Sequence, residues 1–84
     1  MPMASEIVPD TRPEPERAAS AAESCRARAA SPAHAAMEIA SLLTVALGYI
    51  AGDDPKRKAS ALARADVYLE EIRALLGLAR GGAR

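Results

Sequence analysis

The most apolar stretch of the chain covers residues 36–51 and reads AMEIASLLTVALGYIA. Its apolar residues recur at steps of three and four, which predicts an α-helix with two adjacent apolar lines. The first line contains Ala36, Ala40, Leu43, Leu47 and Ile50, and the second contains Ile39, Leu42, Ala46 and Tyr49. A face this wide exceeds what a surface helix needs to bury against one neighbour. We therefore expect this helix to be covered from more than one side.

Helix-start and helix-end signals lie on either side of this stretch. Ser31 can cap the exposed N–H groups at a helix start, and Pro32 fits the first helical position. At the other end, Gly52 suits the left-handed backbone conformation that often follows the last helical residue. The sequence therefore predicts a first main helix over about residues 32–51.

A second helix start follows at once, with Asp54 as the cap and Pro55 at the first helical position. This helix should run over about residues 55–76 and end at Gly77 or at Gly81–Gly82, because its apolar residues keep a three–four alternation. They are Leu62, Ala65, Leu69, Ile72, Leu76 and Ala79. Since the connection between the two helices is very short, we expect an antiparallel helical hairpin over residues 31–80.

The segments outside the hairpin carry weaker patterns. Residues 1–15 hold four of the six prolines, which predicts a flexible arm. Residues 16–30 are rich in Ala, Glu and Arg and favour a helix, but the apolar face of that helix contains only small side chains. This segment is expected to be either a short third helix or a linker, and residues 81–84 are expected to be a frayed tail.

The hairpin alone leaves the first main helix incompletely covered. Either a second copy of the chain completes a dimeric four-helix bundle, or residues 16–30 complete a three-helix monomer. We favour the homodimer, because the small side chains of residues 16–30 offer little apolar area. The residues expected in the core and dimer interface are Ile39, Leu42, Leu43, Leu47, Ile50, Leu62, Leu69, Ile72 and Leu76. Replacement of Leu43 or Leu47 by Asp should then abolish folding and association together.

Length and cysteine content agree with the need for a partner. The chain has 84 residues, enough for one small domain, and a core of this size is marginal without a staple. Cys25 is the single cysteine and His34 the single histidine, which excludes an internal disulfide and does not suggest a structural zinc site. A Cys25–His34 nucleophile would lack an orienting third group and an oxyanion loop. We expect no catalytic, metal-binding or cofactor-binding residues and no enzymatic activity.

The charge balance argues against nucleic acid and membrane partners. Eleven basic and eleven acidic residues cancel, and the chain has no Trp or Phe on which bases could stack. A DNA-reading helix-turn-helix is disfavoured because the middle of the second helix is acidic, with Asp66, Glu70 and Glu71. The apolar stretch is shorter than the roughly 20 residues that cross a bilayer, and the N-terminus has no signal-peptide pattern. The prediction is a cytoplasmic protein.

The main basic cluster of the chain is Lys56, Arg57 and Lys58, in the first turn of the second helix. Cations at this end oppose the helix dipole, so the preceding aspartates are their natural neighbours. One interpretation is a solvated helix start balanced by Asp53 and Asp54. The functional interpretation is that these three residues contact an acidic protein or a phosphate group.

The segments AMEIASLLTVA and ARADVYLEEIRALL resemble a family of short proteobacterial proteins of unknown function, common in pseudomonads. The matching residues are Ala36, Glu38, Ala40, Ser41, Leu42 and Leu43 in the first helix, and Ala65, Tyr68, Leu69, Ile72 and Leu75 in the second. Gly48 and the Lys56–Lys58 turn depart from the family pattern. The resemblance implies a Pro-rich arm followed by a two-helix hairpin, and it implies no activity.

These observations predict a non-enzymatic protein-interaction module, a homodimeric helical hairpin that acts as a regulator or inhibitor by binding another protein. The excess of Arg over Lys and the abundance of Ala indicate a GC-rich bacterial genome, and a phage or mobile-element origin fits such a regulator. The alternative is a subunit or chaperone-like partner whose first helix is covered by a larger protein. A third hypothesis is peripheral membrane association through the apolar helix.

Overall fold

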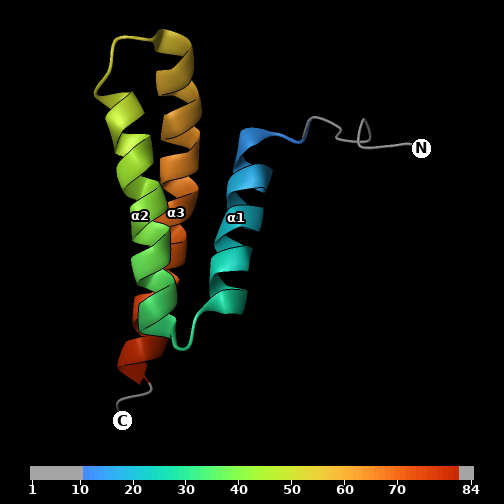
Figure 1. Ribbon diagram of the computed structural model, residues 1–84, viewed down its shortest axis with the longest axis vertical. Helices are drawn as coiled ribbons and strands as arrows, with labels where there is room; N and C mark the ends of the chain where they lie inside the picture. Colours follow the sequence, from blue (N-terminus) through green and yellow to red (C-terminus); the bar gives the residue numbers. More distant parts are fainter. Residues whose placement is uncertain (1–10, 82–84) are drawn as a thin grey trace, which may run out of the picture.

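The chain folds into three α-helices, and no strand occurs in the part that a computed structural model describes, residues 11–81. The helices are α1 (Glu14–Arg28), α2 (Pro32–Ile50) and α3 (Pro55–Gly81). Figure 1 shows α2 and α3 as neighbouring antiparallel helices and α1 as a separate helix beside them. The prediction of an all-helical chain is confirmed. Residues 16–30, which the sequence left open between helix and linker, belong almost entirely to α1.

Both predicted helix starts of the hairpin are confirmed by their hydrogen bonds. The Ser31 hydroxyl accepts a bond from the His34 backbone N–H at 3.2 Å, and Pro32 is the first residue of α2. The Asp54 carboxylate accepts bonds from the N–H groups of Lys56 and Arg57 at 3.0 and 3.4 Å. These bonds satisfy N–H groups that have no partner inside the helix, and they fix where each helix begins.

The end of α2 differs from the prediction. Ala51 keeps a helical backbone, with φ −75° and ψ −13°, and Gly52 does not adopt the left-handed conformation. Instead the Gly52 N–H donates to the Tyr49 carbonyl at 3.1 Å, a bond that spans three residues and tightens the last turn. The turn therefore closes without the conformational freedom that only glycine offers.

Of the two ends that the sequence allows for the last helix, Gly77 and Gly81–Gly82, the structure agrees with the second. α3 continues through Gly77 as far as Gly81 and contains 27 residues. A single glycine inside a helix costs about 1 kcal/mol relative to alanine, and the strong helix formers around Gly77 offset that cost. α3 therefore extends beyond the start of α2, as Figure 1 shows at the lower end of the hairpin.

The start of α1 lies inside the predicted Pro-rich arm. Glu14 and Pro15 are helical, although the sequence placed both in the arm of residues 1–15. Proline is tolerated there because the first N–H groups of a helix have no internal partner. Residues 1–10 of the predicted arm, and residues 82–84 of the predicted tail, lie outside the described residues.

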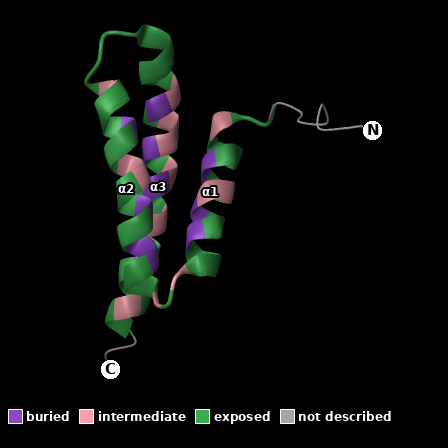
Figure 2. Ribbon diagram, viewed as in Figure 1, coloured by how far each residue is buried: buried purple, intermediate pink, exposed green. Residues whose placement is uncertain are grey.

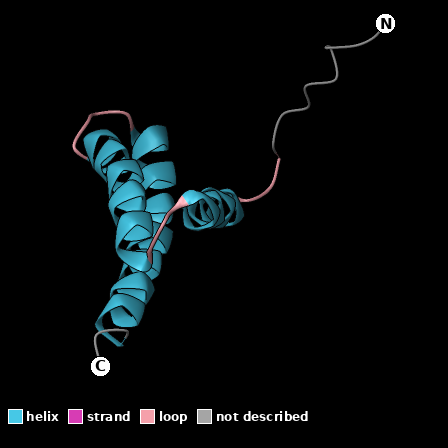
Figure 3. Ribbon diagram, turned by 60° about the horizontal axis from the view of Figure 1, so that its bottom comes forward, coloured by secondary structure: helices cyan, strands magenta, loops and turns pink. Residues whose placement is uncertain are grey.

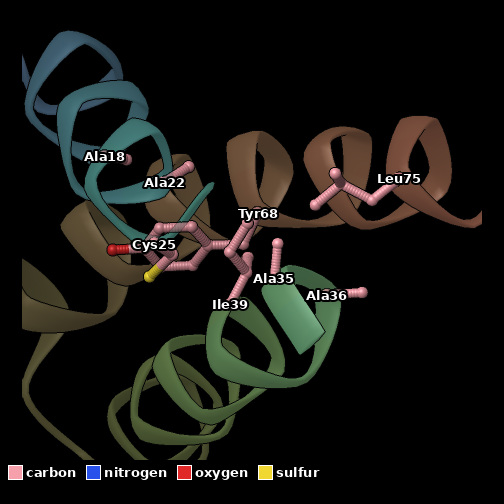
Figure 4. Packing of buried hydrophobic residues seen from close by; sticks show 8 residues of the cluster. All are labelled: Ala18, Ala22, Cys25, Ala35, Ala36, Ile39, Tyr68 and Leu75. Carbon is pink, nitrogen blue, oxygen red and sulfur yellow. The ribbon is translucent and has the colours of Figure 1, made fainter. Parts of the chain in front are cut away.

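The small side chains of α1 pack against the hairpin and are buried there. Ala18, Ala22 and Cys25 are exposed by 1%, 0% and 4%. Figure 4 shows the ring of Tyr68 reaching from α3 toward α1, beside the Cys25 sulfur and above Ile39 of α2. Small residues allow the helices to approach closely, so one large ring supplies the apolar area that the alanines lack.

Three ion pairs between α1 and the hairpin lie at the edges of this contact. Glu14 pairs with Arg64 at 3.3 Å, and Arg28 pairs with Glu38 at 3.3 Å. Arg26 pairs with Glu71 of α3. Such partly exposed pairs contribute at most about 1 kcal/mol each, so they set the position of α1 more than they hold it in place.

The helix α1 crosses the hairpin and does not extend it into a regular bundle. Figure 3 shows α1 nearly end-on, whereas α2 and α3 are seen obliquely in the same view. The molecule measures only 17 Å along its shortest axis, and Figure 2 shows the buried residues gathered where the helices meet. One side of the hairpin is therefore covered by α1, and no other helix of residues 11–81 covers the opposite side.

Replacement of Gly52 by Ala should leave the free energy of unfolding unchanged or raise it by up to about 1 kcal/mol. The added Cβ would lie 3.4 Å from the Tyr49 carbonyl oxygen, which is ordinary contact, and alanine reduces the freedom of the unfolded chain. Urea denaturation followed by circular dichroism measures the change. A loss of about 1 kcal/mol or more would show that Gly52 needs the left-handed conformation that the sequence suggested.

Stability should fall above pH 10 because of Tyr68. Burial raises the pKa of its hydroxyl above the ordinary value of 10.0, Arg64 lowers it, and Glu14 and Cys25 raise it further. With a raised folded-state pKa, the Tyr68 contribution is complete below pH 10 and is lost as the pH rises through that pKa. The thermal midpoint of the natural protein should therefore fall relative to that of Tyr68→Phe as the pH increases from about 8 to about 11. Parallel decline of the two midpoints would contradict the assignment to Tyr68.

Candidate functional site

The nine residues predicted for the core and dimer interface divide into three groups by exposure. Ile39 is completely buried. The half-buried members are Leu42, Leu43, Ile50 and Ile72. Four leucines remain exposed in the monomer: Leu47 by 51%, Leu62 by 49%, Leu69 by 47% and Leu76 by 45%. The monomer core is built instead largely from small residues, Ala18, Ala22, Cys25, Ala35, Ala36, Ala46, Ala61 and Ala65, with Tyr68 and Leu75.

The exposed leucines of α3 form a line along one side of the helix. Leu62, Leu69 and Leu76 are spaced by seven residues, and seven residues make almost two complete helical turns. Tyr68 and Arg64 mark the side of α3 that contacts α1. Because successive residues are about 100° apart around a helix, Leu69 is turned about 100° from Tyr68, and Leu62 about 160° from Arg64. The leucine line therefore faces away from α1.

The exposed leucine of α2 lies on the same side of the hairpin. Glu38 marks the side of α2 that faces α1, because it pairs with Arg28. Leu47 follows Glu38 by nine residues and Leu43 by five, which turns them about 180° and 140° away from it. We call the surface formed by Leu43, Leu47, Leu62, Leu69 and Leu76 the open leucine face. It lies on the side of the hairpin opposite α1 and extends over both helices.

Other exposed apolar side chains lie away from this surface. Met37 and Leu78 are exposed by 68% and 63%. Leu78 follows Leu76 by two residues, so it points to a different side of α3, about 200° around the helix. Single exposed apolar residues are normal on protein surfaces, whereas a row that continues across two helices marks a contact surface. Leu78 therefore provides a matched comparison for the leucines of the face.

The second candidate site is a basic groove where α2 ends, α3 begins and α1 starts. Its volume is about 480 Å³, and its lining residues are Glu14, Tyr49, Lys56, Arg57, Ser60 and Arg64. The guanidinium carbons of Arg57 and Arg64 lie 5.7 and 5.8 Å from the centroid of the Tyr49 ring. At such distances the ring attracts both cations. The groove therefore gathers positive charge around one aromatic side chain.

The structure brings together only part of the predicted basic cluster. Lys56 and Arg57 line the groove, whereas Lys58 is exposed outside its lining. Sequence reasoning missed Arg64, although it follows Arg57 by seven residues and therefore lies on the same side of the helix. It also missed Tyr49, because no pattern within α3 reveals which residue of α2 lies beside it.

The acidic neighbours of the groove neutralise it in part. The Asp54 Oδ2 lies 3.6 Å from the Arg57 Nε, which is beyond an ordinary hydrogen bond, and Glu14 is shared between Arg64 and Arg17. Of the two aspartates expected to balance the positive charge of this helix start, Asp54 therefore does so in part, through its contact with Arg57. Three cations and one carboxylate line the groove, which leaves its lining with a net positive charge.

Cys25 and His34 occupy different surroundings. Cys25 is buried under α1 beside Tyr68, and the Arg28 guanidinium is 3.9 Å from its sulfur. His34 is exposed at the start of α2, with Nδ1 2.9 Å from the Ser31 hydroxyl that caps the helix. Within residues 11–81, no group of three or more His, Cys, Asp or Glu side chains is arranged to hold a metal ion.

By length and composition alone, α2 is apolar enough to cross a membrane. The helix has 19 residues, more than the apolar stretch considered in the sequence, and 22% of its most apolar window is buried inside the molecule. The core helix of a soluble protein and a signal sequence pass the same test. Within residues 11–81, most of this apolar window is therefore left uncovered.

Comparisons of the chain with protein-family models, with curated proteins and with solved structures gave no match. The resemblance to short proteobacterial proteins therefore stays a prediction from the two helical segments. Any functional assignment depends on the two surfaces described above.

Proposed function

We propose that this chain is a non-enzymatic helical interaction module that forms a homodimer through the open leucine face and regulates or inhibits another protein. Two hairpins packed face to face would give the four-helix bundle expected from the hydrophobic pattern. The observation that carries the proposal is the line of half-exposed leucines on the side of the hairpin opposite α1. We place this module in the bacterial cytoplasm.

The energy still available from burial supports association. Complete burial of a leucine side chain is worth about 1.5–3 kcal/mol, and Leu47, Leu62, Leu69 and Leu76 realise only part of it in the monomer. The core of the monomer consists mainly of alanines, which bury little area each. A second copy would cover the same four leucines on both chains, since the surfaces of a two-fold dimer are identical.

The size of the face also suits a dimer. At about 1.5 Å per residue, the 19 residues of α2 are about 30 Å long, and two helices side by side are about 20 Å wide. Each copy would then bury on the order of 600 Å², which is close to the lower end of stable specific interfaces. By helical spacing from the residues that pair with α1, the open leucine face lies on the opposite side of the hairpin, so α1 does not obstruct this contact.

The dimer would leave the basic groove accessible. The groove includes Glu14 of α1 and Arg64, which both belong to the side of the hairpin away from the open leucine face. One side of each hairpin would then serve self-association, and the other side would be available to bind a target protein. This separation supports an interaction module with distinct surfaces for each role.

A different protein could cover the open leucine face in place of a second copy. The chain would then be a subunit or chaperone-like partner of a larger complex, and the exposure of Leu47, Leu62, Leu69 and Leu76 favours this alternative equally. The solution mass separates the two hypotheses. A homodimer stays folded when purified alone, whereas a subunit without its partner aggregates or loses fixed tertiary packing.

Sedimentation of the purified chain over a range of concentrations should show a dimer, and Leu69→Glu should raise its dissociation constant by about 100-fold or more. Because the interface of a two-fold dimer contains this position once on each copy, two unpaired carboxylates would be buried, and that weakens association. Leu78→Glu introduces the same charge on another side of α3 and should leave the dimer intact. Leu47→Asp should give a folded monomer and not an unfolded chain, because Leu47 is already half exposed.

Two results would contradict this proposal. A well-folded monomer at high concentration would show that the three helices suffice alone, and equal weakening by Leu69→Glu and Leu78→Glu would place the interface elsewhere. Circular dichroism of each variant shows whether the helices persist, so that loss of association is distinguished from loss of folding.

The dimer should not sediment with lipid vesicles, because its apolar leucines are covered. The test uses neutral and anionic vesicles with the natural protein and with Leu69→Glu. Binding of the natural protein to both vesicle types would contradict the homodimer and support membrane association through α2, whose length and composition permit it. Binding of Leu69→Glu alone would show that the leucines are apolar enough for lipid once they are uncovered.

A further inference from the structure

The basic groove holds its cations in a fixed arrangement. Arg57 and Arg64 are two helical turns apart on α3, and both guanidinium groups lie within 6 Å of the same Tyr49 ring. Ser60 lies between them on the same side of the helix, at spacings of three and four residues. Contact with the ring and with Glu14 restricts these long side chains, so less conformational entropy is lost when they bind an anion.

The charged groups in the groove are incompletely matched by its own carboxylates. Asp54 already accepts two backbone N–H bonds through Oδ1, and its contact with Arg57 is long at 3.6 Å. The Arg57 side chain is 67% exposed, whereas that of Arg64 is 24% exposed and is paired with Glu14. Arg57 and Lys56 therefore present positive charge to the solvent, and Arg64 lies deeper beside them.

We infer that this groove binds a short acidic segment of the target protein, with side-chain carboxylates placed against Lys56 and Arg57. Guanidinium groups bind carboxylates through paired N–H donors, and the hydroxyls of Ser60 and Tyr49 add donors in the same groove. A volume of about 480 Å³ is within the range of sites that hold a few side chains. This inference rests on the proposed function in one respect, namely that the target is a protein.

A peptide suits the groove better than a nucleic acid. A long polyanion would extend from the groove along the same side of α3, where Glu71 lies seven residues beyond Arg64. Glu14 and Asp54 at the rim also repel a continuous row of phosphates. A short segment with two or three carboxylates can contact the cations and avoid these acidic groups. Charge complementarity over a short distance therefore selects an acidic peptide.

The inference is tested with hexaglutamate as the probe and the full chain labelled with ¹⁵N for nuclear magnetic resonance. Addition of the peptide should shift the amide signals of Tyr49, Arg57, Ser60 and Arg64. The binding should weaken as salt is raised, because screening reduces attraction between exposed charges. Shifts confined to the open leucine face, or no shifts at all, would overturn the inference.

Matched charge variants distinguish the groove from general electrostatic attraction. Arg57→Gln should weaken hexaglutamate binding by about two- to fivefold, as loss of one exposed charge pair implies. Arg73→Gln removes the same charge from the same helix, nine residues beyond Arg64 and outside the groove, and should have little effect. Lys56→Gln provides a second groove variant. Equal weakening by Arg57→Gln and Arg73→Gln would overturn the inference.

Two further measurements identify the ligand class and separate this inference from the dimer. Inorganic phosphate at equal ionic strength should not displace hexaglutamate, and displacement would assign the groove to phosphate groups instead. Leu69→Glu should bind the peptide as the natural protein does, because the groove is on the other side of the hairpin. Peptide binding by a natural protein that is itself monomeric would contradict the proposed dimer and leave the groove assignment standing, whereas a dimeric natural protein without peptide binding would do the reverse.

Discussion

The width of the apolar face on α2 is the constraint on which the rest of the structure depends. A helix with two apolar lines cannot be covered by one neighbour. Residues 11–81 contain two other helices, α1 and α3. α3 covers the centre of the face along its length. α1 covers one edge, where its alanines pack around Tyr68 of α3. The opposite edge, with Leu47 and the half-buried Leu43, stays open together with the leucine line of α3. The proposed association of the chain rests on this unequal coverage.

The docking of α1 gives the molecule two different sides. Because α1 crosses the hairpin on one side only, polar and ionic contacts gather there, including the pairs Glu14–Arg64 and Arg28–Glu38. The other side carries the open leucine face, and none of the described helices packs on it. The same event completes the basic groove, since Glu14 of α1 forms part of its wall beside Tyr49 and Arg64. One helix of small residues therefore separates the surface suited to self-association from the surface suited to an acidic target.

The structure divides candidate residues that the sequence had placed in one group. The sequence treated Leu62, Leu69 and Leu76 as one group with Ile39, because all four follow helical spacing. In the structure Ile39 is completely buried, and the three leucines are about half exposed. The basic cluster changes in a similar way, because Lys58 lies outside the groove and Arg64 lies inside it. Periodicity identifies which residues share a side of one helix, but it does not identify what faces that side.

The sequence by itself determined the all-helical class, the helix starts at Ser31–Pro32 and Asp54–Pro55, and the excess apolar surface of α2. These features depend on local hydrogen bonding and on the spacing of side chains along one helix, which the order of residues specifies directly. Only the tertiary structure decided that α1 packs against the hairpin, that Gly52 is not left-handed, and that Tyr49 lies within 6 Å of both Arg57 and Arg64. Each of these depends on how closely two segments approach. For α1 the close approach is made by alanine side chains, whose small area had favoured, in the sequence alone, a second copy of the chain over residues 16–30 as the cover for α2.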